Sequence, residues 1–121
     1  MHLLFVCVGN SCRSQMAEGL ARSMGHIAVS AGTHPASSTI ASNAQKYLES
    51  RGISTKDMIP KSVDDFSADD YDMVISMGCG VNCPSMKIDE DWGIEDPYGQ
   101  QYEVYKKTAE EIERRLKLLE Q

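Results

Sequence analysis

Short apolar runs alternate with amphipathic patterns along the chain, and this alternation limits the possible folds more than any other feature. The runs cover 3–8, 27–30 and 71–77, and helical spacing of apolar residues covers 11–24, 38–51 and 101–121. Short runs that are apolar throughout are typical of strands buried on both faces of a parallel sheet. Ile88 or the stretch 92–95 adds a short edge strand, and a short helix is expected near 63–66. The pattern predicts an α/β fold, a three-layer sandwich in which helices flank a central four-stranded parallel sheet.

Length and charge narrow the class of protein. A chain of 121 residues is expected to form a single domain over 1–121, because folding at this length hides roughly two thirds of the unfolded surface. The net charge of -6 argues against nucleic acid as a partner, since phosphate backbones need a basic face. No apolar run approaches the ~20 residues of a membrane span, and no signal-peptide pattern opens the sequence. We therefore expect a cytoplasmic monomer with no membrane contact.

The cysteine content bears on chemistry. The sequence holds four cysteines, at positions 7, 12, 79 and 83. In a reducing compartment, cysteines are more typical of catalytic, redox-active or metal-binding sites than of structural disulfides. Cys7 ends the first predicted strand and Cys79 follows the third. Because ligands bind beyond the carboxyl ends of parallel strands, these two thiols are predicted to be neighbours.

The turn between the first predicted strand and helix carries the most specific chemistry. Its sequence is Cys7-Val8-Gly9-Asn10-Ser11-Cys12-Arg13-Ser14. A loop that enters a helix directs backbone N–H groups inward and forms a nest for an anion, and Gly9 and Asn10 tolerate the dihedral angles that it needs. Arg13 can close the nest with a planar fork that matches two oxygens, while Ser14 can donate to the Cys7 sulfur. These donors favour the thiolate, so the pattern predicts a nucleophile at the base of an oxyanion site.

This turn has two other interpretations. Cys7 could be a small core residue at a strand end, with Arg13 on the surface of the helix. A nucleotide-binding Walker loop is excluded, because no Gly-Lys-Ser or Gly-Lys-Thr follows. The apolar strand, the Gly-Asn turn and the helix start favour the oxyanion site.

The chain resembles the low-molecular-weight protein tyrosine phosphatase superfamily over nearly its whole length. The matching segments are the loop 7–14, the stretch 30–33 and the pair Asp96-Pro97. The resemblance implies that Cys7 attacks a phosphate or similar oxyanion, that Arg13 and the loop amides bind it, and that Asp96 is the general acid. The substrate-binding residues that it implies are Val8, Gly9, Asn10, Ser11, Cys12, Arg13 and Ser14.

Within the superfamily, three features resemble the thioredoxin-coupled arsenate reductases. They are the stretches 15–19 and 77–84 and the pair Trp92-Gly93, whereas Tyr98 after Asp-Pro is common in phosphatases. This resemblance implies reduction of arsenate to arsenite, a weak phosphatase side activity, no bound cofactor, and thioredoxin as electron donor and partner. The alternative is a protein tyrosine phosphatase that hydrolyses phosphotyrosine through a phosphocysteine intermediate.

The reductase branch also implies a relay of thiols. Cys7 attacks arsenate, Cys79 attacks Cys7 and releases arsenite, and Cys83 then attacks Cys79 to give a disulfide that thioredoxin reduces. The spacing Cys79-x3-Cys83 is shorter than in the best-known members. The order of exchange is therefore open, and a Cys7–Cys12 disulfide, known as a protective pairing in the phosphatases, is the alternative.

The sequence argues against two further classes of site, a zinc site and a non-catalytic binding module. Cys79 and Cys83 have tolerable spacing for zinc, but the histidines at 2, 26 and 34 have no ligand-like spacing, so no metal is predicted. A non-catalytic module that binds phosphorylated partners would need Arg13 but no thiol at position 7, so Cys7 argues against it.

Overall fold

The elements alternate between strand and helix along most of the chain. The structure is a computed structural model and describes residues 1–35, 37–78 and 86–119. In chain order its strands and α-helices are β1 (His2–Cys7), α1 (Arg13–Ser23), β2 (Ile27–Gly32), α2 (Ser42–Ser50), β3 (Met73–Ser76), β4 (Glu90–Asp91) and α3 (Tyr102–Leu119). Two short 3-10 helices, η1 (Val63–Asp65) and η2 (Ala68–Asp70), precede β3. The expected short helix near 63–66 is confirmed by η1.

The four strands form one sheet in the order β2-β1-β3-β4, and every pairing in it is parallel. Cys7 at the end of β1 pairs with Gly32 at the end of β2, and Val6 pairs with Ser76 at the end of β3. The chain leaves β1 toward β2 and later crosses to β3 on the other side of β1. The carboxyl end of β1 is thus the point where the strand order reverses, which is where ligands bind in open α/β sheets.

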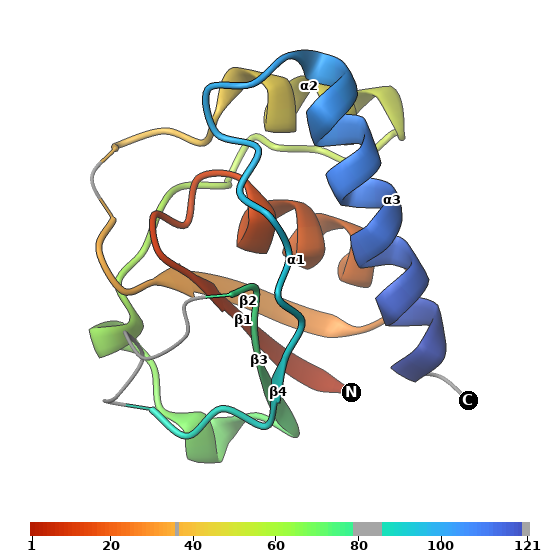
Figure 1. The fold of residues 1–121 in the computed structure, drawn as a ribbon. Helices are drawn as coiled ribbons and strands as arrows, with labels where there is room; N and C mark the ends of the chain where they lie inside the picture. Colours follow the sequence, from red (N-terminus) through yellow and green to blue (C-terminus); the bar gives the residue numbers. More distant parts are fainter. Residues whose placement is uncertain (36, 79–85, 120–121) are drawn as a thin grey trace.

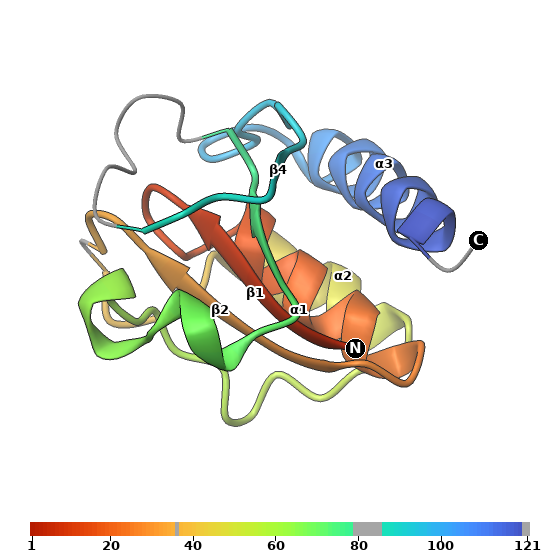
Figure 2. The same cartoon turned by 90° about the horizontal axis from the view of Figure 1, so that it is seen from below.

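The predicted three-layer sandwich with a four-stranded parallel sheet is confirmed, and its two outer layers differ in kind. Alternate residues of the central strands face opposite sides: Leu3, Phe5 and Ile75 join a core with α1, α2 and α3. Leu4 and Val74 join a second, smaller core with η1, η2 and the segment 86–88. Figures 1 and 2 show the three α-helices gathered on one side of the sheet and the 3-10 helices on the other.

Two elements differ most from the sequence-based expectations. The predicted edge strand lies at Glu90–Asp91, between the two proposed positions, because its charged, exposed residues pair with the end of β3 and carry no apolar pattern. Helix α2 begins at Ser42 and not at 38, because the backbone N–H of Thr39 bonds to the Ser37 hydroxyl (3.2 Å) in a local turn.

The segment after β4 is held against the sheet by apolar contacts. Trp92 and Ile94 are buried, and the Trp92 ring lies 6.0 Å from the Phe5 ring, centroid to centroid. This packing carries the chain back to the carboxyl end of β1. Among the residues that the structure describes, no helix is long and apolar enough to cross a membrane.

Candidate active site

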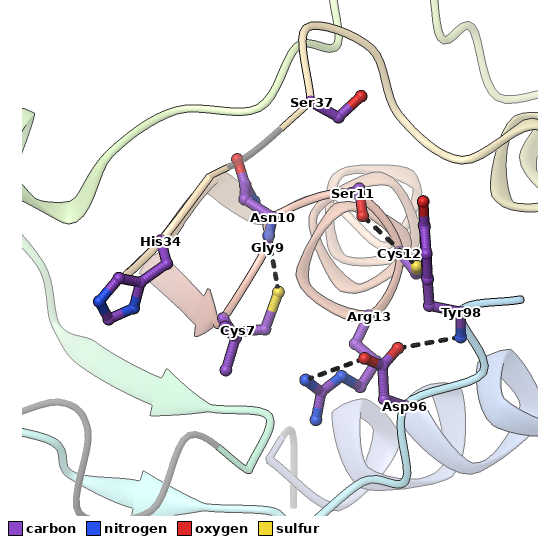
Figure 3. A pocket seen from close by; sticks show the side chains of 11 residues that line it. Cys7, Gly9, Asn10, Ser11, Cys12, Arg13, His34, Ser37, Asp96 and Tyr98 are labelled. Carbon is purple, nitrogen blue, oxygen red and sulfur yellow. Dashed lines mark hydrogen bonds and ion pairs between the residues drawn. The ribbon is translucent and has the colours of Figure 1, made fainter.

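The loop that follows β1 wraps around the Cys7 sulfur. The backbone N–H of Asn10 donates to Cys7 Sγ (3.1 Å), and Ser14 Oγ lies 2.8 Å from the same atom. The sulfur lies at a cavity of about 280 Å³, which Figure 3 shows from close by. The cavity is lined by Cys7, Val8, Gly9, Asn10, Ser11, Cys12, Arg13, His34, Ser37, Asp96 and Tyr98. A cavity of this size beside a thiol and a ring of donors can hold a tetrahedral oxyanion.

Asn10 gives the loop its shape. It is fully buried and has a φ of 53°, the left-handed region that side chains rarely adopt. Its Nδ2 donates to Ser14 Oγ (2.7 Å), and its Oδ1 accepts from the backbone N–H of Lys61 (2.8 Å). Gly9, which was also expected to need unusual dihedral angles, is not in the left-handed region. Of Gly9 and Asn10, only Asn10 therefore has a strained backbone conformation.

Arg13 is buried, which rules out the interpretation that Cys7 is only a core residue and Arg13 lies on the surface of the helix. Its Nη1 donates to the carbonyl oxygens of Met77 (3.0 Å) and Ile94 (2.9 Å). These bonds hold the guanidinium at the cavity and leave its other N–H groups for an anion. The surroundings are tight, because a Cβ on Gly78 would lie 3.2 Å from Nη1.

Asp96 lies at the same cavity as Cys7 and Arg13 (Figure 3). One carboxylate oxygen, Oδ2, lies 3.9 Å from Arg13 Nη2, and the other, Oδ1, accepts from the backbone N–H of Tyr98 (3.0 Å). The Asp96 side chain is 52% exposed, so solvent can exchange protons with it. A carboxyl group at this place can give a proton to an oxygen that leaves the bound anion.

Cys12 lines the cavity too, but its thiol has other surroundings. Its Sγ lies 3.6 Å from Ser11 Oγ and 3.9 Å from Tyr105 Oη, and burial raises the pKa of this thiol above its usual value. Burial and the neighbouring Cys12 raise the pKa of Tyr105 to about 12. Cys7 and Cys12 are both free thiols in the structure. Cys12 is therefore a neutral thiol near neutral pH, and Cys7 is the sulfur that accepts a loop N–H.

The structure brings together most of the residues that the sequence singled out. The loop residues, Arg13 and Asp96 meet at one cavity. Cys79 and Cys83 lie outside the described residues, as does the zinc alternative built on them. Within the described ranges, no group of three or more His, Cys, Asp or Glu side chains is placed to hold a metal.

Five residues at or behind the loop were not predicted as site residues, although two of them, Gln15 and Tyr98, were noted for the branch of the superfamily that they resemble. His34 and Ser37 follow β2 and line the cavity with Tyr98, while Gln15 and Lys61 contact the loop from behind. Gln15 carried a signal that could have found it, because it is a polar residue directly before the apolar positions of α1. Lys61 carried none, since it contacts the loop through its backbone.

Comparisons with known proteins agree with this geometry. The sequence profile described as low molecular weight phosphotyrosine protein phosphatase matches residues 2–121. A "Glutaredoxin arsenate reductase" from Synechocystis is 43% identical over 125 residues, which cover 97% of this chain and 94% of that relative. A solved structure described as an arsenate reductase in the phosphate binding state is 39% identical, with a TM-score of 0.87 and coverage of 98% of this chain and 95% of that one. The low molecular weight protein tyrosine phosphatase from T. tengcongensis is 33% identical, with a TM-score of 0.77 and coverage of 98% and 97%.

Proposed function

Because the chain belongs to the low molecular weight phosphotyrosine protein phosphatase family, and to its arsenate reductase branch, we propose that it reduces arsenate to arsenite at Cys7. One observation carries the proposal: Cys7 Sγ meets a loop N–H and the Ser14 hydroxyl at a cavity that Arg13 and Asp96 also line. Such a site suits attack by sulfur on a bound tetrahedral oxyanion. Whether the Cys7–arsenic adduct is reduced to arsenite then depends on attack by a second thiol.

The first step forms a bond between sulfur and arsenic. The Cys7 thiolate attacks arsenic, a hydroxyl group of the arsenate takes a proton from Asp96, and that group leaves as water while the sulfur–arsenic bond forms. The Arg13 guanidinium and the loop N–H groups stabilise the negative charge on the remaining oxygens. Ser14 supports the thiolate before attack, because its oxygen accepts from Asn10 Nδ2 and its proton is free for Cys7 Sγ.

The second step transfers the electrons. The Cys79 thiolate attacks the Cys7 sulfur, the sulfur–arsenic bond breaks, and its electron pair goes to arsenic, which leaves as arsenite. A Cys7–Cys79 disulfide remains, and attack by Cys83 on Cys79 frees Cys7 again and leaves a Cys79–Cys83 disulfide. Each exchange needs a thiolate with access to the disulfide. The position of Gly78 supports this scheme, because a Cβ built on Gly78 would lie 3.2 Å from Arg13 Nη1 and Cys79 is the next residue in the sequence.

The electrons come from outside the chain. A protein thiol–disulfide donor reduces the final disulfide, and no bound cofactor is needed. The motif in 77–84 resembles that of thioredoxin-coupled enzymes, whereas the relative that is 43% identical is named for glutaredoxin. We favour glutaredoxin as the donor, because that relative matches nearly the whole chain. Multiple-turnover assays with each purified donor system decide between the two.

A single-turnover experiment tests the reductase function. The fully reduced protein is mixed with arsenate without any reductant, free thiols are then blocked, and disulfides are mapped by peptide mass. We expect one arsenite released per chain and a disulfide that includes Cys79. Four free thiols with no arsenite would contradict the proposal. Cys79→Ser should lose multiple-turnover reduction and keep hydrolysis of an aryl phosphate, whereas Cys7→Ser should lose both.

Phosphatase activity is the second candidate function, and the similarity to the T. tengcongensis phosphatase favours it. Cys7, Arg13 and Asp96 would have the same roles in this reaction, and a phosphocysteine would form in place of the arsenic adduct. Hydrolysis needs water and no second thiol. A protein that hydrolyses phosphotyrosine rapidly, binds arsenate and releases no arsenite would be a phosphatase.

A further inference from the structure

Gln15 lies behind the oxyanion loop, and the chemistry proposed above does not use it. The side chain is fully buried, and its Nε2 donates to Asn10 O (3.2 Å), Asn10 Oδ1 (3.1 Å) and Ile59 O (2.9 Å). The opposite orientation of the amide would place Oε1 against these three oxygens. Oε1 itself has no hydrogen-bond partner among the described residues. A buried amide in this arrangement stabilises the fold only through the bonds that Nε2 donates, because an oxygen buried without a partner costs free energy.

The bonds from Gln15 set the direction of the Asn10 side chain. Asn10 Oδ1 faces two donors, Gln15 Nε2 and the Lys61 backbone N–H, so Asn10 Nδ2 points the other way, to Ser14 Oγ (2.7 Å). Ser14 Oγ accepts that bond and lies 2.8 Å from Cys7 Sγ. A continuous series of hydrogen bonds therefore runs from Gln15 through Asn10 and Ser14 to the thiol.

The third acceptor of Gln15 connects the loop to a fixed part of the fold. Lys61 accepts from the Gly32 N–H at the end of β2 (2.7 Å), and the side chain of Lys61 lies 3.8 Å from the buried carboxylate of Glu18 on α1. The segment 59–61 is therefore anchored at β2 and α1. Through Ile59 O and Asn10, Gln15 joins this anchored segment to the loop.

We propose that Gln15 is a positioning residue that holds Asn10 in its left-handed conformation and thereby sets the oxyanion affinity of the loop and the reactivity of Cys7. A non-glycine residue pays in free energy for this conformation and keeps it only where neighbouring groups determine it. The inference rests on the proposed function in one respect, the assignment of Cys7 as the nucleophile. It adds a side chain that touches neither substrate nor sulfur.

Three variants test it. Gln15→Met keeps the length and volume of the side chain and removes the donor. Gln15→Glu places a carboxylate against the three acceptor oxygens. Thr55→Val is the matched control, because it removes one hydrogen bond of a buried hydroxyl, Thr55 Oγ1 to Glu49 Oε2 (2.9 Å), that involves no residue of the loop.

The readouts are local to the loop. The rate of Cys7 alkylation by iodoacetamide is measured at fixed pH, with tandem mass spectrometry to separate Cys7 from Cys12, and the affinity for inorganic phosphate is measured by protection against alkylation. We expect Gln15→Met to weaken phosphate binding and slow alkylation by about three- to tenfold, since the hydrogen bonds that Nε2 donates to its three acceptors are lost. Gln15→Glu should reduce phosphate affinity and the alkylation rate further. Thr55→Val should stay within about twofold of the wild type in both readouts.

The outcomes separate the inference from the proposed function. If Gln15→Met and Gln15→Glu bind phosphate and react as Thr55→Val does, Gln15 is an ordinary core residue and the inference is wrong. If phosphate does not protect Cys7 of the wild type, both the proposed function and the inference are wrong. Should Gln15→Met fail to fold, Gln15→Ala, which lets water reach the three acceptors, is measured in its place and judged by the same criterion.

Discussion

Replacing Gly32 with alanine should displace the oxyanion loop. Gly32 ends β2, and a Cβ built on it would lie 2.6 Å from the carbonyl oxygen of Val8 and 2.9 Å from Cβ of Asn10. Neither atom belongs to the end of a flexible side chain, so the backbone must move. Strand β2 cannot easily move away from the loop, because Gly32 is paired with Cys7 and its N–H donates to the carbonyl oxygen of Lys61.

The magnitude follows from the contact. Overpacking of this kind costs about 1–3 kcal/mol in the free energy of unfolding. If about 1.4 kcal/mol of that cost is borne by the loop in its binding conformation, phosphate affinity falls about tenfold. The assay is urea unfolding with and without phosphate, together with protection of Cys7 against alkylation. Phosphate should stabilise the wild type and stabilise Gly32→Ala much less.

Gly9→Ala is the control, because it adds the same methyl group to the loop itself. The nearest atom to a Cβ there is Ser11 Oγ at 3.5 Å, an ordinary contact, and the backbone is not in the left-handed region. We expect Gly9→Ala to bind phosphate nearly as the wild type does. Equal affinity and equal unfolding midpoints for Gly32→Ala and Gly9→Ala would refute the reasoning.

Three other predictions concern the guanidinium of Arg13, the packing of the core, and the stability of the protein at alkaline pH. Arg13→Lys should stay folded by circular dichroism and lose at least about tenfold in phosphate affinity, because an ammonium cannot bind two carbonyls and fork onto two oxygens. Ile112→Ala should lower the free energy of unfolding by about 2–5 kcal/mol in urea, and a loss under about 1 kcal/mol would contradict its place in the core. The pKa of Tyr105 is raised to about 12, so the folded protein keeps a proton that the unfolded chain releases near pH 10. Stability should therefore fall between about pH 10 and 12 by up to about 1.4 kcal/mol per pH unit, and Tyr105→Phe should fall less steeply in the same unfolding assay.

The sequence predicted the local parts of the site well. The apolar strand, the Gly-Asn turn and the start of the helix each depend on neighbouring residues, and together they indicated that Cys7 and Arg13 face one anion. Strands β1, β2 and β3 and the last helix were found for the same reason, because apolar periodicity is a local signal. Gly9 was the exception within the loop, since composition alone could not tell which of two adjacent residues takes the positive φ.

The backbone groups that fix the site from distant parts of the chain could not be predicted. Nothing near Arg13 in the chain indicates that the carbonyls of Met77 and Ile94 hold it, because backbone acceptors have no sequence signature. The same holds for the backbone N–H of Lys61, which fixes Asn10. Strand β4 was misplaced because two exposed acidic residues form it, and its pairing depends on the end of β3 and not on its own pattern.

The parallel sheet has a consequence for how the protein folds and unfolds. Among the described residues no strand pairs with its neighbour through a hairpin, so each pairing requires closure of a long loop, and folding should be slow for a chain of this length. The oxyanion loop draws its contacts from the ends of β1, β2 and β3 at once, and it can form only after those closures. A bound oxyanion should therefore act mainly on the rate of unfolding, since the contacts that it strengthens are made after the transition state. Bound phosphate would then slow the loss of this fold before any arsenate is met.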